Sequence, residues 1–204
     1  MQSIVSALVG LLLLPGAAIS HAPSFAAQTS TTTPEAAADA GEVPLSRSAH
    51  GARFMAAVTA YNALPSQTDG SPLETASGAY ANPEIVAARS RDLAEKLPFG
   101  TVIAIEPVAT SSSPSCGYDL VKPQIGYRVI ADTMHPSKHD QVDILLDHTQ
   151  TVQVGGKQMN PGIAFGICRN MRIRVVGHVD MAKLPKTQAE LVRALERSQT
   201  LALR

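Results

Sequence analysis

The segment ADTMHPSKHDQVDI, residues 131–144, carries two aspartates at the ends of apolar, β-branched runs that are separated by a polar loop. The runs at 127–131 and 142–146 have the composition of short strands, so the loop can fold Asp132 and Asp143 toward one another. A carboxylate held next to another is hard to ionise, and a raised pKa is what a carboxylic acid needs to donate a proton near neutral pH. The alternative interpretation is that both aspartates are solvated or cap turns at strand ends.

The rest of the folded part has the pattern of further short strands. Runs at 53–61, 85–88, 101–107 and 171–176 are rich in β-branched residues or alternate in polarity, and Pro and Gly turns separate them. Gly155-Gly156-Lys157 is expected to form a hairpin turn. This pattern predicts a small, mainly β barrel. Residues 187–195, with Thr187 as N-cap, predict a short C-terminal amphipathic helix that docks on the barrel.

Several short motifs occur in a fixed order between residues 58 and 146. They are Thr59-x-Tyr61, Thr75-x-x-Gly78, Leu97-Pro98-Phe99-Gly100-Thr101, Asp132-Thr133 and Val142-Asp143-Ile144. In this order they resemble the 3D domain, which is named for three aspartates. That domain is a double-psi β-barrel module of MltA-type lytic transglycosylases and of spore and resuscitation-associated muralytic proteins.

The resemblance implies a six-stranded double-psi β-barrel whose substrate is the glycan strands of peptidoglycan, cleaved without a cofactor. By the same resemblance Asp143 is the catalytic acid and Asp132 its neighbour. Thr59, Tyr61 and Thr75 would line the groove. Lys138 matches the family's lysine, and it would offset the charge of the aspartates or hold a substrate carboxylate.

The sequence departs from the family pattern in the loop between the aspartates. Met134-His135 replace a Gly-Gly pair, and His139 replaces a glycine. The family's first aspartate has two candidate equivalents, Asp92, which is one residue out of register, and Ser90. Two alternatives therefore stay open: a non-catalytic, wall-associated glycan-binding barrel, and an inverting glycoside hydrolase that uses Asp132 and Asp143 as a pair.

The N-terminal part predicts export. Residues 1–26 contain no Asp, Glu, Lys or Arg, and their apolar run ends in Ser24-Phe25-Ala26, which is typical of a signal peptide. The run is too short for a stable membrane span. We expect a disordered linker at 27–50, the barrel domain at 51–184 and a helical tail at 185–204. The protein would be periplasmic or secreted, and in that compartment Cys116 and Cys168 are expected to form a disulfide.

Composition argues against other classes of function. The formal net charge is zero and only 17% of the residues are charged, so we expect no nucleic-acid partner. His135, His139 and His148, with Asp140 and Asp147, contain the residue types of a metal site. The first two flank a proline in a loop, where the i, i+4 geometry of a helix is not available, so we predict no metal site.

Overall fold

The computed structural model describes residues 51–68, 70–108 and 116–202. The predicted signal peptide and linker, and the serine-rich loop at 109–114, lie outside the described residues.

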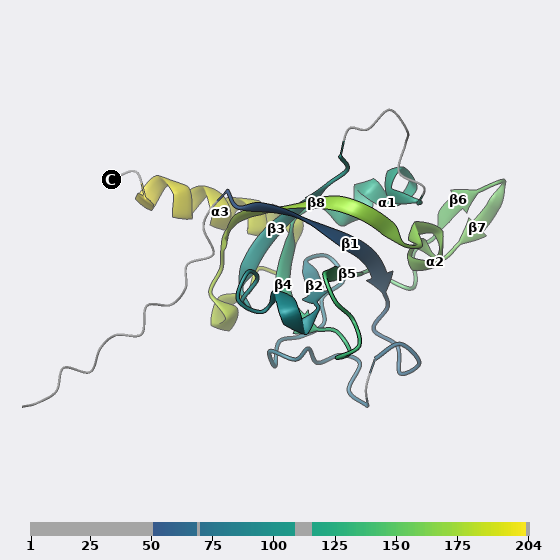
Figure 1. The fold of residues 1–204 in the computed structure, drawn as a ribbon, viewed down its shortest axis with the longest axis horizontal. Coiled ribbons are helices and arrows are strands. Elements are labelled where there is room, and N and C mark those ends of the chain that lie inside the picture. Colours follow the sequence, from purple (N-terminus) through teal and green to yellow (C-terminus); the bar gives the residue numbers. More distant parts are fainter. Residues whose placement is uncertain (1–50, 69, 109–115, 203–204) are drawn as a thin grey trace, which may run out of the picture. The chain divides into compact units, whose positions relative to one another are not determined.

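Six strands close into a barrel, which confirms the mainly β fold predicted from the sequence (Figure 1). The strand order around the barrel is β1-β5-β2-β4-β3-β8. Two pairs of neighbours, β1 with β5 and β2 with β4, run parallel, and the other pairs run antiparallel. The barrel strands are β1 (Arg53–Tyr61), β2 (Val86–Arg89), β3 (Thr101–Glu106), β4 (Arg128–Thr133), β5 (Gln141–Leu145) and β8 (Cys168–His178).

Alternation along the strands divides the buried side chains into two clusters. Neighbours in sequence such as Ala87 and Ala88, or Ile144 and Leu145, belong to different clusters because successive side chains point to opposite faces of a strand. The first cluster includes apolar residues of the short helices after β3 and β7, and the second includes Leu191 and Leu195 of the C-terminal helix. Both faces of the sheet are therefore covered.

Short helices and a hairpin complete the fold. The hairpin turns at Gly155 and Gly156, as predicted. Two helices were not predicted: α1 is only eight residues long and contains Pro123, and α2 begins with the helix-start pair Asn160-Pro161. The remaining elements are η1 (Arg91–Leu93), α1 (Tyr118–Ile125), β6 (Val152–Val154), β7 (Lys157–Met159), α2 (Pro161–Phe165), η2 (Met181–Lys183) and α3 (Gln188–Ala202).

The C-terminal helix α3 docks on the barrel, as predicted, and runs further than residue 195. Thr187 caps it by accepting a hydrogen bond from the Glu190 N–H at 3.2 Å, while the Glu190 carboxylate accepts from the Lys186 N–H at 2.7 Å. Leu191 and Leu195 are buried against the second cluster. None of the helices in the described part of the chain has the length and apolar content that a membrane span requires.

Cys116 and Cys168 form the predicted disulfide, with their Cα atoms 5.2 Å apart. It joins the residues just before α1 to the first residue of β8.

Candidate active site

Strand register brings the two aspartates to the same level of the barrel. Thr59 on β1 pairs with Asp143 on β5, Asp143 pairs with Ala88 on β2, and Ala88 pairs with Asp132 on β4. Because neighbouring strands lie about 4.8 Å apart, the backbones of the two aspartates are roughly 10 Å apart. Between them the sheet carries only the methyl group of Ala88.

A β-bulge turns Asp132 toward this level. Between Ala87 and Ala88 the register with β4 shifts by one residue, so that Ala87 pairs with Ile130 but Ala88 pairs with Asp132. Ile130 belongs to the first cluster, so strict alternation would point Asp132 to the face of that cluster, opposite to Ala88. With the extra residue Ala131, Asp132 shares a face with Ala88 and Asp143.

A cleft of about 810 Å³ opens over these residues. Five of the predicted site residues line it: Tyr61, Thr75, Lys138 and both aspartates. Thr59 and Asp92 are not part of its lining. The full lining consists of Tyr61, Gln67, Thr68, Ser71, Pro72, Glu74, Thr75, Ala76, Ala81, Ala88, Arg91, Asp132, Thr133, Met134, His135, Pro136, Lys138 and Asp143.

Asp143 has the properties of a proton donor. Its half-buried carboxyl group accepts a hydrogen bond from the Thr59 hydroxyl at 2.8 Å, and burial raises its pKa to about 6. The Thr59 hydrogen bond and the charge of Lys138 act in the opposite direction, and the charge of Asp132 makes only the smallest contribution to raising the pKa. The raised pKa predicted from the neighbouring carboxylate therefore has desolvation as its main cause.

Asp132 is fixed by three hydrogen bonds. Its Oδ2 accepts from the Tyr61 hydroxyl at 2.9 Å, and its Oδ1 accepts from the backbone N–H groups of Ala76 and Thr133 at 2.9 and 2.8 Å. Burial, together with the Asp132 carboxylate, raises the pKa of Tyr61, so the phenol keeps its proton and remains a donor. Three donors therefore hold the Asp132 carboxyl group in one orientation.

Thr75 shapes the wall of the cleft and binds neither aspartate. Its hydroxyl donates to the Ala79 carbonyl at 3.0 Å and accepts from the Ala79 N–H at 3.2 Å, which closes a tight turn around Gly78, where φ is +79°. This turn presents the N–H of Ala76 to Asp132. Thr75 thus acts on the site through the loop it closes.

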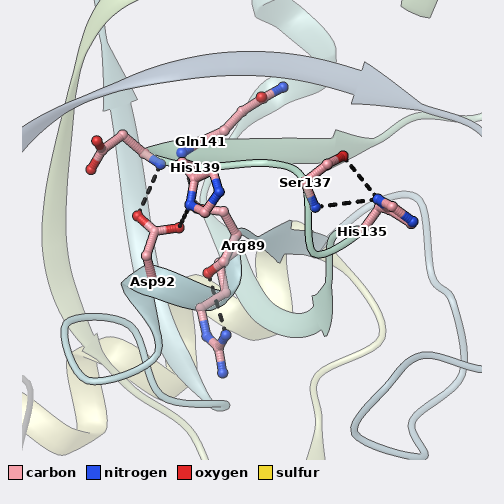
Figure 2. A network of polar contacts seen from close by, with 8 residues as sticks. Arg89, Asp92, His135, Ser137, His139 and Gln141 are labelled. Atoms are coloured by element: carbon pink, nitrogen blue, oxygen red, sulfur yellow. Dashed lines mark hydrogen bonds and ion pairs between the residues drawn. The ribbon is translucent and has the colours of Figure 1, made fainter.

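The loop between β4 and β5 is held at its C-terminal end by Asp92 of η1 (Figure 2). The Asp92 carboxylate accepts from the Asp140 N–H at 2.9 Å and lies 3.7 Å from His139, and the Asp140 hydrogen bond lowers the pKa of Asp92. Within the loop the Ser137 N–H donates to Nδ1 of His135 at 3.3 Å. Asp92, the candidate third aspartate, is therefore placed as a support of this loop.

Sequence reasoning missed two residues of the site. Gln141 donates to the Thr59 hydroxyl at 2.8 Å, and Arg91 lines the same cleft as Lys138. Arg91 follows β2, whose C-terminal end lies between the end of β4 and the start of β5, so the β4–β5 loop passes beside it. Neither residue lies in a motif that would have identified it.

The histidines of the site do not build a metal centre among the described residues, where no three His, Cys, Asp or Glu side chains converge. Comparison with known proteins adds no identity: no protein-family model matches the sequence, and the search of curated proteins finds no match.

Proposed function

We propose that this chain is an exported cell-wall protein that cleaves the glycan strands of peptidoglycan as a lytic transglycosylase does, with Asp143 as its single acid and base. The observation that carries the proposal is a half-buried carboxyl group with a pKa near 6 in an open cleft, beside a second carboxylate whose oxygens are already hydrogen-bonded. The resemblance of the motifs around both aspartates to the 3D domain supplies the reaction class.

In this reaction the Asp143 carboxyl group gives its proton to the glycosidic oxygen as the bond from that oxygen to C1 breaks. The resulting carboxylate then takes the proton of the muramoyl C6 hydroxyl. The C6 oxygen bonds to C1 and closes a 1,6-anhydro ring. No water and no second nucleophile are consumed, so a single titrating acid is enough.

Two cations in the cleft can pair with carboxylates of an acidic polymer, although Glu74 and both aspartates line the cleft as well. Arg91 and Lys138 both line it, and neither forms an ion pair with a described residue. Peptidoglycan carries carboxylates on its muramoyl groups and stem peptides, which two cations can attract. The disulfide supports a location in an oxidising compartment outside the cytoplasm.

The hydrogen bonds of Asp132 disfavour the inverting hydrolase. An inverting pair needs a second carboxylate that activates water, and Asp132 already accepts from three donors. A glycan-binding barrel without turnover is the second candidate. It is favoured by Met134 and His135, which line the cleft where the family has glycines.

Mass spectrometry of muropeptides released from purified sacculi separates these functions. Anhydro ends are expected from the wild-type protein and none from Asp143→Asn, while Asp119→Asn, at an exposed position on α1, should release as much as wild type. Reducing ends would instead indicate a hydrolase. Retention on sacculi with no release would assign the protein to the binding-module class.

A further inference from the structure

A chain of two hydrogen bonds leads from Gln141 to Asp143. Both residues lie on β5, two positions apart and therefore on the same face, and Thr59 lies opposite Asp143 on β1. The Gln141 side-chain amide donates to Oγ1 of Thr59 at 2.8 Å, and Thr59 donates to Oδ1 of Asp143 at 2.8 Å. The register thus places a side-chain amide behind the hydroxyl that touches the acid.

The chemistry of these groups determines which group donates in each of the two hydrogen bonds. An amide nitrogen can only donate, and a hydroxyl group has a single hydrogen. When Thr59 accepts from Gln141, its own hydrogen is directed at Oδ1 of Asp143. Oδ1 is then an acceptor in both protonation states, and the proton of the neutral acid lies on Oδ2.

The position of Thr59 assigns Oδ2 to the cleft side. Asp143 lines the cleft, whereas Thr59, which holds Oδ1, does not. No described residue donates to Oδ2, which leaves it available to a bound substrate. If Thr59 instead donated its hydrogen to Gln141, the proton of the neutral acid would lie on Oδ1, between Asp143 and Thr59 and away from the cleft.

Gln141 is itself held in place. Its backbone N–H donates to Oγ of Ser90 at 3.1 Å, and the Ser90 N–H donates to the Gln141 carbonyl at 2.9 Å. Ser90 is fully buried. Ala57, which pairs with Gln141 on β1, has no polar side chain that would compete for the amide.

We propose that Gln141 is a positioning residue: by donating to Thr59 it fixes the direction of the Thr59 hydroxyl and holds the acid proton of Asp143 on the oxygen that faces the cleft. The catalytic consequence rests on the proposed function, in which Asp143 is the acid. The hydrogen-bond direction itself does not depend on turnover and is measured separately.

The other charged or titratable groups around Asp143 act through space. They are Asp132 on β4, Lys138 in the β4–β5 loop and Tyr61 on β1. None of them donates to an Asp143 oxygen. Substitutions at 59 and 141 therefore change the hydrogen-bond chain and leave these charges in place.

The direct test is a carboxyl carbon NMR titration of Asp143. Thr59→Val removes the donor, and because the Thr59 hydrogen bond lowers the pKa of Asp143, its loss should raise that pKa by about one to two pH units. Gln141→Glu supplies an acceptor in place of the amide. It should draw the Thr59 hydrogen away and raise the pKa by a similar amount. Thr59→Ser should restore the wild-type titration.

A double-mutant cycle separates this effect from the added charge. In the Thr59→Val background the Gln141→Glu change should shift the Asp143 pKa much less than in the wild-type background, because no hydroxyl is left to redirect. Gln153→Glu, at an exposed position on β6, is the charge control and should shift nothing. Equal shifts in both backgrounds, or no shift in either, would overturn the proposal.

The catalytic consequence is read from sacculus cleavage. Gln141→Glu should lower the turnover rate at a pH where Asp143 is still protonated and move the alkaline limb of the pH profile upward, while Gln153→Glu does neither. If wild-type protein releases nothing, the proposed function fails, and the titration still decides the direction of the hydrogen-bond chain. A turnover rate equal to wild type in Gln141→Glu would remove the positioning role.

Discussion

Asp143 shows how a single residue acquires its chemistry from its position on a strand. Its side chain points to the same face as Ala88, between strands β1 and β2, and loses much of its contact with water there. Desolvation raises the pKa because it disfavours the charged form, and one donor from Thr59 and the nearby Lys138 limit the rise. The result is an acid that is protonated in mildly acidic conditions.

The raised pKa of Asp143 also predicts how stability depends on pH. The pKa of this carboxyl group rises on folding from 3.8 to about 6. Its ionisation therefore leaves the free energy of unfolding nearly unchanged below about pH 4 and lowers it by the full amount above about pH 6. Asp143→Asn removes that cost. The variant should gain on the order of 3 kcal/mol relative to wild type between pH 4 and pH 7. Denaturant unfolding across this range measures the gain, and parallel pH curves for the two proteins would contradict it.

At the residue scale the sequence predicts the acids better than their surroundings. Asp132 and Asp143 lie at the ends of apolar runs and in recognisable motifs. Two predicted strands joined by a loop therefore predict that these aspartates lie close together. The cause of the raised pKa could not be predicted, because burial depends on which strands flank Asp143. Gln141 gave no signal either, since its role arises from the parallel pairing of β5 with β1, which is remote in sequence.

At the scale of elements, β2 is the strand that organises the site. It lies between β4 and β5, so its residue Ala88 separates the two aspartates, and the bulge at Ala131 turns Asp132 to the same face. The strand itself was predictable from its composition. The bulge was not, because it depends on pairing and leaves no sequence pattern.

The small size of Ala88 is predicted to be required for substrate access. Ala88→Val places two more methyl groups on the floor of the cleft between the aspartates, while valine suits a strand well. We expect glycan cleavage to fall at least about tenfold, with a loss of stability below about 1.5 kcal/mol. Sacculus cleavage and thermal unfolding measure the two effects.

Ala88→Gly is the matched control, because it keeps the cleft open although it weakens the strand by about 1 kcal/mol. It should cleave more than Ala88→Val at a comparable loss of stability. Wild-type cleavage by Ala88→Val would show that substrate does not reach the floor between the aspartates.

A buried arginine joins α1 to the barrel. Arg128, the first residue of β4, is fully buried and donates to backbone carbonyls of α1, of β2 and the residues before it, and of β5. Among the described residues no carboxylate forms an ion pair with it, and burial lowers its pKa to about 9, so it remains charged at neutral pH. The acceptors are the carbonyl groups of Pro83, Val86, Gln124, Ile125 and Leu145.

Arg128→Met should destabilise the fold by about 3 kcal/mol, because it leaves several buried carbonyl groups without a donor. Arg128→Lys is the informative comparison. Its ammonium has three donors and no planar fork, so it should recover only part of the loss. Denaturant unfolding measures both variants. A methionine variant as stable as wild type would mean that these carbonyl groups find other partners.

At the scale of the molecule, the barrel closes by pairing strands that are far apart in sequence. Its first strand β1 lies between β5 and β8, so neither neighbour is adjacent in the chain. Strand composition and turn signals predicted the mainly β class and a small barrel, and the number of barrel strands was implied by the family resemblance. They could not predict the strand order, which depends on contacts across the whole domain.

The disulfide provides the last prediction, because it acts on the whole chain. Cys116 and Cys168 close a loop of 52 residues that contains β4, β5 and both aspartates, and restricting the unfolded chain in this way contributes about 4 kcal/mol. Reduction of the wild-type protein, or replacement of both cysteines by serine, should lower the free energy of unfolding by up to that amount. Neither cysteine lines the cleft, so sacculus cleavage under conditions where the protein stays folded should persist. Thermal unfolding with and without reductant, on samples whose thiols are counted by alkylation, measures the effect. Equal midpoints for the oxidised and the fully alkylated protein would show that the crosslink adds nothing to stability.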